Sequence, residues 1–165
     1  MSIGAKYDTS ACRFAPLGAM TRDFLPVQVA QRWLLFRAEP IREILGAQVS
    51  LPIPGARPEV PAVFAWRGRA VPVVDVAPLL GFGSDAFSAQ NRRRSRTVIV
   101  EHARSVVGVT VDWAREVQRV DTDVLAEPHA ERIPYARAEL HWEDVVMTVV
   151  DLDLLLEDLT NGGKR

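Results

Sequence analysis

The chain has 165 residues, 48% of them hydrophobic, a size that allows one substantial core or two small adjoining ones. Its 20 basic and 21 acidic residues leave a formal net charge of −1, which excludes a global field that would attract nucleic acid, acidic lipid or an anionic substrate. The single cysteine, Cys12, excludes an internal disulfide and favours a reducing compartment.

The first 22 residues predict a flexible arm. Gly4, Pro16 and Gly18 are mixed there with charged residues, and no apolar run long enough for a secretory signal is present. Elsewhere, no stretch approaches the ~20 apolar residues of a membrane span. We therefore expect a cytoplasmic protein with no direct membrane insertion.

From Phe24 onward, short Val-rich runs alternate with Pro, Gly and charged clusters, a pattern typical of a many-stranded β protein. The predicted strands are residues 24–29, 33–37, 63–66, 70–74, 97–101, 106–111, 116–120, 137–142 and 145–150. The proline-rich span 51–61 is expected to be a loop, because proline has no N–H to donate to a strand ladder.

Two local patterns occur twice in the same order, which predicts two related half-domains. IREI at 41–44 is matched by AREV at 114–117, and VVDVAPLL at 73–80 by VVDLDLLL at 149–156.

The second pattern also predicts two helix starts. In both copies a β run meets an aspartate and then an apolar helical segment, so Asp75 and Asp151 are expected to be helix N-caps. A catalytic carboxylate pair would instead need both side chains to face one cleft. The second helix is expected to end at Asn161, before Gly162 and Gly163.

The run FAWRGRAVPVVDV at 64–76 resembles the signature hairpin of CheW-like domains, in which an Arg-Gly turn leads into a Pro-Val-Val-Asp strand end. Further motifs resemble the second-barrel core and closing strand of that family, in the same order: TVIVE at 97–101, VGVTVD at 107–112, REV at 115–117 and MTVVDL at 147–152. The chain is thus similar to CheW-type coupling proteins from about residue 24 to residue 159.

This resemblance implies a mainly β fold of two adjoining five-stranded SH3-like barrels, with short helices, one of them at the C-terminus, and an apolar groove between the barrels. A single CheW-like domain would span 23–160, followed by a tail at 161–165. The first barrel would cover about 30–85 and the second about 95–150, with a first strand that the two could share.

The resemblance also implies a non-enzymatic adaptor. CheW-like proteins bind the cytoplasmic tip of methyl-accepting chemoreceptors and the regulatory domain of a CheA-type histidine kinase, so these are the expected partners, in membrane-proximal receptor arrays. The family's receptor-contact positions fall here on Ile41, Glu43, Ala62, Arg67, Val98 and Val117. Gly68 is expected to form the turn after Arg67.

Each of these positions also has a structural alternative. Ile41, Val98 and Val117 could be plain core residues. Arg67 could be an exposed turn charge or a backbone clamp, and Glu43 could merely form a surface ion pair with Arg42 or Arg69, worth ~0–1 kcal/mol.

Two residues depart from the family pattern, which has Gly at Ala62 and Asn at Ala65. If the glycine serves a positive φ or the close approach of a partner, the Ala62 methyl group stands in the way, and receptor choice is affected. Trp66 stands where Leu is common and is expected to fill the core, with a place in the groove wall as the alternative.

Enzymatic signatures such as G-x-S-x-G, H-E-x-x-H and C-x-x-C are missing from the sequence, so no catalytic residue is predicted. His102, His129 and His141 fall in segments of different type, and we expect no metal site and no cofactor.

Two rival functions remain open at this point. The basic run NRRRSR at 91–96 is typical of small β barrels that bind RNA or single strands, but the interleaved aromatics of such sites are missing, so we expect a solvated loop and no nucleic acid. A divergent CheW paralogue that competes with the coupling protein and uncouples the kinase is the other rival.

Overall fold

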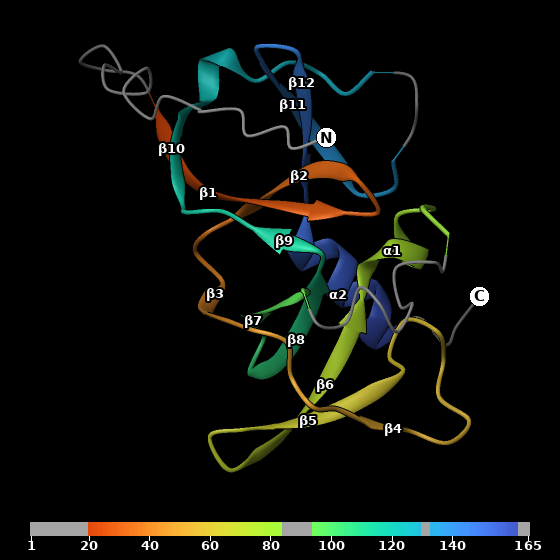
Figure 1. The fold of residues 1–165 in the computed structure, drawn as a ribbon. Coiled ribbons are helices and arrows are strands. Elements are labelled where there is room, and N and C mark those ends of the chain that lie inside the picture. Colours follow the sequence, from red (N-terminus) through yellow and green to blue (C-terminus); the bar gives the residue numbers. More distant parts are fainter. Residues whose placement is uncertain (1–19, 84–93, 130–132, 162–165) are drawn as a thin grey trace.

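The computed structural model describes residues 20–83, 94–129 and 133–161 (Figure 1). In chain order the elements are β1 (Thr21–Val29), β2 (Arg32–Arg37), β3 (Ile41–Leu45), β4 (Leu51–Pro52), β5 (Ala62–Trp66), β6 (Arg69–Asp75), α1 (Val76–Leu79), β7 (Arg96–His102), β8 (Ser105–Val111), β9 (Trp113–Ala114), β10 (Gln118–Asp121), the 3-10 turn η3 (Thr122–Val124), β11 (Ala136–Trp142), β12 (Val145–Val150) and α2 (Leu152–Asn161). The prediction of a mainly β fold with a C-terminal helix is confirmed. None of the helices in these ranges has the length and apolar content needed to cross a membrane.

In the described part of the chain the strands form two sheets of six strands each, one more strand per sheet than the five expected in each barrel. The first sheet has the order β10-β1-β2-β12-β11, with β9 also paired to β1. The second has the order β3-β7-β8-β6-β5-β4. Each sheet contains one parallel pair, β2 with β12 and β6 with β8, and the other pairings are antiparallel.

The two halves of the chain have exchanged their first hairpins. Each half runs hairpin, edge strand, hairpin, helix, yet hairpin β1-β2 joins the β9–β12 strands of the second half, and hairpin β7-β8 joins the β3–β6 strands of the first. The sheets therefore do not follow the expected division into barrels at about 30–85 and 95–150. Each sheet contains strands from both halves because β2 pairs with β12, and β6 with β8, in parallel across the two halves.

The hydrophobic core has three layers because strands β2 and β7 are buried on both faces. Leu34 and Phe36 of β2 point into a shared core between the sheets, built from β1, β2, β6–β8, β12 and both helices, whereas Leu35 points into an inner core of the first sheet. In β7, Val98 faces the shared core and Ile99 the inner core of the second sheet. Burial on both faces explains why these strands read as continuous apolar runs.

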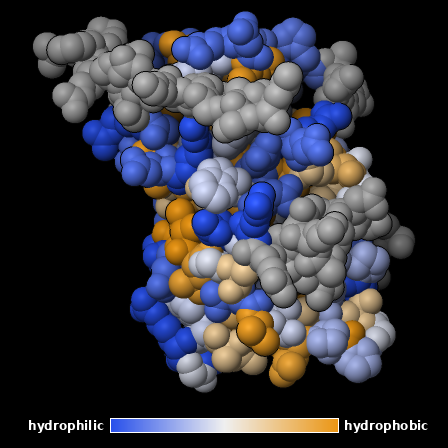
Figure 2. All heavy atoms as spheres, in the orientation of Figure 1, coloured by the Kyte–Doolittle hydropathy of each residue, from blue (hydrophilic) through white to orange (hydrophobic). Residues whose placement is uncertain are grey.

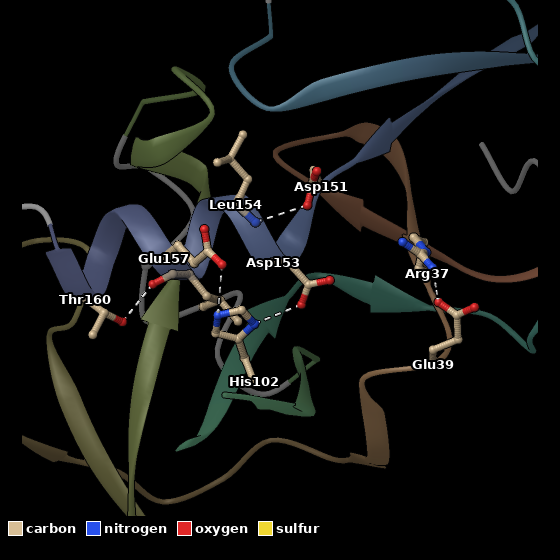
Figure 3. Close-up of polar contacts among 9 residues, drawn as sticks. Arg37, Glu39, His102, Asp151, Asp153, Leu154, Glu157 and Thr160 are labelled. Carbon is tan, nitrogen blue, oxygen red and sulfur yellow. Dashed lines mark hydrogen bonds and ion pairs between the residues drawn. The ribbon is translucent and has the colours of Figure 1, made fainter. Parts of the chain in front are cut away.

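Both helices begin at the aspartates that the sequence indicated. The Asp75 carboxylate accepts a hydrogen bond from the Ala77 N–H at 3.0 Å. The Asp151 carboxylate accepts one from the Leu154 N–H at 3.0 Å, which Figure 3 shows. Helix α2 then buries leucines of one face in the shared core and is described as far as Asn161. The predicted cap at Gly162 and Gly163 lies outside the described residues.

Three elements differ from the sequence prediction. Strand β3 was not predicted, since its alternating half-buried pattern carries charges at Arg42 and Glu43. The expected strand 116–120 is observed as β10 at Gln118–Asp121, and an additional short strand, β9, precedes it; both pair with β1. Part of the expected loop 51–61 forms β4, where Pro52 is tolerated because β4 lies at the sheet edge.

Candidate functional site

A groove of about 650 Å³ opens where β3 of the second sheet approaches the first sheet. Its floor belongs to the inner core of the first sheet, through Leu35, Leu140 and Met147. Its remaining lining residues are Pro26, Ile44, Trp113, Ala114, Arg115, Glu116, Val117, Gln118, Val120 and Trp142. The groove is therefore continuous with a hydrophobic core and mainly apolar.

Large apolar side chains on the groove walls are open to solvent. Ile44 is 39% exposed, Trp113 45% and Val117 49%. In Figure 2, hydrophobic atoms gather on the side of the molecule where β3 and β9 lie in Figure 1. Exposed apolar side chains that adjoin in this way are typical of a binding surface.

A polar corner, made of Glu43, Trp66 and Arg67, lies on the other side of strand β3. The Trp66 indole N–H donates to the Glu43 carboxylate at 3.0 Å, and the Arg67 guanidinium donates to the same oxygen at 3.2 Å. Arg67 also stacks over the Trp66 ring, 4.8 Å from its centroid, while its side chain remains 71% exposed. Glu43 is thus held in place, and Arg67 keeps much of its surface free for contact.

The turn after β5 orients Arg67. Arg67 and Gly68 have φ values of 48° and 76°, and a two-residue hairpin with positive φ at both positions is the type I′ turn that matches strand twist. Glycine takes this conformation without strain, so Gly68 occupies the turn position that the sequence assigned to it.

The structure distributes the six expected receptor-contact residues over different environments. Val117 lines the groove, and Glu43 and Arg67 meet in the polar corner. Ile41 is half-buried against the shared core. Ala62 is 5% exposed and Val98 is 0% exposed, so neither side chain reaches the surface in this structure.

The Ala62 methyl group points into the inner core of the second sheet, where it packs with Phe64 and Val71. A positive φ is not found at this residue. The methyl group is therefore part of the core packing in this structure. Trp66 packs partly buried against the same inner core and donates its N–H to Glu43, but it is not among the residues that line the groove.

Sequence reasoning missed most of the groove wall. Ile44, Trp113 and Trp142 come from three separate elements, and only the tertiary fold brings them together. Trp113 also supplies an aromatic neighbour to the basic run, because the Arg96 guanidinium lies 4.7 Å from its ring centroid. Residues 91–93 of that run lie outside the described residues.

None of the three histidines lines the groove. The His102 ring lies 2.9 Å from the Asp153 carboxylate of α2, which places it among satisfied polar residues (Figure 3). The expectation that the histidines are scattered is wrong for the other two, since His129 and His141 have ring centroids 5.7 Å apart and both adjoin Glu139.

Comparison with known proteins matches residues 23–160 to the model of the CheW-like domain family. The chain belongs to this family. It is 23% identical over 144 residues to the chemotaxis protein CheW of Thermotoga maritima, covering 84% of this chain and 89% of that protein. The crystal structure of the scaffolding protein TtCheW from Thermoanaerobacter tengcongensis superimposes with a TM-score of 0.71 at 20% identity, covering 87% of this chain and 90% of the other.

These findings give the general class of the protein. The structural likeness shows that the two sheets form the two-part SH3-like fold of CheW. As a CheW-like domain, the chain is an adaptor of the chemotaxis type rather than an enzyme.

Proposed function

We propose that this CheW-like domain couples methyl-accepting chemoreceptors to a CheA-type histidine kinase in the cytoplasm, beside membrane-proximal receptor arrays. The observation that carries the proposal is the apolar groove with its exposed wall residues Ile44, Trp113 and Val117. Chemoreceptor tips are helical hairpins, and an amphipathic helix is recognised by an apolar groove that receives side chains from one helix face. No chemistry is required of the adaptor itself.

Strand β3 links the groove to the polar corner. Ile44 lines the groove, and the neighbouring Glu43 holds Arg67 in the corner. A helix that buries apolar side chains against Ile44 and Val117 would bring its polar flank to Arg67, which can bond a carboxylate or a carbonyl. Ile41, Ala62 and Val98 then serve as packing that supports this face from behind.

The kinase contact is proposed for the ends of the two barrels. The regulatory domain of CheA-type kinases is built on the same fold, so similar barrels can pair end to end. In an array, many such contacts act together, and avidity allows each one to be weak.

Two substitutions test the docking face. Arg67→Glu reverses the exposed charge in the corner, and Val117→Asp places a charge on the groove wall. We expect each to weaken co-sedimentation with receptor-containing membranes by about 10-fold or more, as residues at the centre of an interface do. Because both side chains are substantially exposed, melting temperatures should change little.

Matched controls make the same chemical change elsewhere. Arg69→Glu alters an exposed arginine on the next strand, and Val124→Asp alters a valine that is 57% exposed outside the groove. Both should leave receptor binding unchanged, and all four variants should still be retained by the kinase regulatory domain. Equal loss in the test and control variants would argue against this docking face.

Kinase activity distinguishes coupler from competitor. In a reconstituted mixture of receptor, kinase and this protein, a coupler places the kinase under receptor control, whereas a competing paralogue reduces the control exerted by the standard coupling protein. Kinase binding that disappears after nuclease treatment would instead point to nucleic acid as the true partner.

A further inference from the structure

A compact group of ligand-type side chains lies apart from the docking groove. His129, Glu139 and His141 each offer one ligand atom, and these atoms all lie within 4.8 Å of one another. The His129 Nδ1 is 2.8 Å from the Glu139 carboxylate, and the His141 Nε2 is 3.7 Å from the same oxygen. Two imidazoles and one carboxylate thus converge on one point.

The fold builds this group from one strand and one crossing segment. Glu139 and His141 are two residues apart on β11, so their side chains share one face of the sheet. An isolated bridge between Ala126 and Glu139 holds the segment after η3 against β11, with N–H···O distances of 2.8 and 2.9 Å. The His129 N–H then donates to the Glu139 carboxylate at 3.1 Å, which fixes the third residue.

Glu139 is unusually placed for a surface-strand glutamate. Its side chain is only 9% exposed, whereas those of His129 and His141 are 75% and 51% exposed. Within the described ranges, the carboxylate meets these two imidazoles and not a lysine or arginine. The partners of this poorly exposed carboxylate are thus side chains that can themselves ligate a metal ion.

We propose that His129, Glu139 and His141 form a binding site for a divalent transition ion of the Zn²⁺ type. Imidazole nitrogen with carboxylate oxygen is a ligand set that suits Zn²⁺ and its neighbours, whereas Mg²⁺ and Ca²⁺ prefer oxygen ligands alone. Three protein ligands leave a fourth position, which would face solvent on the exposed side of the two imidazoles.

The spacing of the ligand atoms agrees with this assignment. Zinc bond lengths place neighbouring ligand atoms about 3.3–3.5 Å apart in a tetrahedral site. The two distances from the Glu139 oxygen, 2.8 and 3.7 Å, lie on either side of that range. All three ligand atoms lie within 4.8 Å of one another, so an ion would replace the hydrogen bond between His129 and Glu139 with side-chain adjustments on the order of 1 Å.

Binding at this place would also affect the other face of β11. Leu140 and Trp142 alternate with the ligands along the strand and line the docking groove. A metal ion that joins the segment around His129 to β11 would hold the groove strand in position from behind.

Cobalt provides the test, because Co²⁺ in a tetrahedral nitrogen and oxygen site absorbs visible light. Titration of the full untagged chain with Co²⁺ should give a visible band that saturates at one ion per chain and disappears when Zn²⁺ is added. Zn²⁺ should also raise the melting temperature, since an ion that binds only the folded state stabilises it. His141→Ala should weaken binding by at least about 10-fold, and because this side chain is 51% exposed the variant should fold as the original chain does.

Two further variants complete the design. Glu139→Gln removes the buried charge and should weaken binding to a similar degree, while His102→Ala removes a histidine outside the cluster and should change nothing. Cys12→Ser should likewise leave the spectrum unchanged. The proposal is overturned if no visible band forms, or if His141→Ala binds Co²⁺ as tightly as the original chain.

Discussion

Asp75 and Asp151 occupy equivalent positions at the start of the two helices but differ in their electrostatic surroundings. Asp75 is 5% exposed, and its burial raises its pKa to about 6, against the opposing effect of the Ala77 N–H. The nearby Asp112 charge adds to the rise. Burial also opposes ionisation of Asp151, but the Leu154 N–H and the Arg137 guanidinium outweigh it, so the pKa of Asp151 is lowered.

The two caps should therefore make opposite contributions to stability as pH changes. Between about pH 4 and pH 6 the unfolded chain ionises Asp75 while the folded protein keeps it protonated, so this residue makes folding less favourable as pH rises. For Asp151 the folded protein favours the ionised form, and that stabilisation is present above its unfolded pKa and lost as pH falls below it.

Two asparagine variants measure this difference. Relative to the original chain, Asp75→Asn should become more stable as pH rises from about 4 to 7, by at most about 3 kcal/mol for a shift of this size. Asp151→Asn should become relatively less stable over the acidic part of the same range. Urea unfolding at several pH values gives both curves, and parallel curves would contradict the assignment.

Single residues also show how far the sequence alone could go. The helix caps were predictable, because an aspartate between a β run and an apolar segment is a local pattern. The hydrogen-bond partner of Glu43 could not be predicted from the sequence. The expected candidates were Arg42 and Arg69, but Arg42 bonds Glu101 on β7, and Glu43 meets Arg67. A register shift between Ile41 and Glu43 determines the directions of the Arg42 and Glu43 side chains, and no sequence pattern predicts this shift.

At the scale of elements, the close approach of β8 to its neighbours depends on Gly108. A Cβ atom at this residue would lie 2.5 Å from Cε1 of Phe64 and 2.9 Å from Cγ2 of Thr97. Both contacts come from the core face of the second sheet, where rings and methyl groups have little room to move.

Gly108→Ala should therefore destabilise the protein by about 1–3 kcal/mol, as overpacked core substitutions do. Gly46→Ala is the matched control, because a Cβ there meets no atom within 4 Å. Chemical denaturation of both variants tests the argument. If Gly108→Ala had the same free energy of unfolding as Gly46→Ala, then β8 and the Phe64 ring could move apart without loss of stability.

Strands with a strong apolar pattern were predicted correctly. Strands that form only because they pair with a neighbouring strand were missed. Strands β2, β7, β8 and β12 are largely buried runs, and their positions were predicted within a few residues. Strand β3 was missed since it lies at a sheet edge with alternate residues exposed. The groove wall was missed for a related reason, as Trp113 belongs to a two-residue strand that exists only through its pairing with β1.

At the scale of the whole molecule, the exchanged hairpins make each half of the chain depend on the other. Without the second half, β2 has no β12 beside it, and β6 has no β8. The shared core would also lose its contributions from β7, β8 and α2. The sequence indicated two related halves, but it carried no sign of the exchange, because parallel pairing between distant strands has no local pattern.

Separate fragments test this dependence. Residues 1–83 and residues 94–165, expressed alone, should each lack cooperative thermal unfolding, and an equimolar mixture should regain the circular dichroism of the intact chain. A cooperative transition in either fragment alone would instead support two barrels that fold independently.

The exchange of hairpins has the topology of a domain-swapped dimer joined into one polypeptide. Two free chains of this kind would have to meet by diffusion, so their assembly would depend on how much protein a cell makes. Joining the halves in one polypeptide instead keeps them at an effective concentration on the order of millimolar. The intact chain therefore stays assembled at any dilution, whereas the same strands on two chains would separate when scarce.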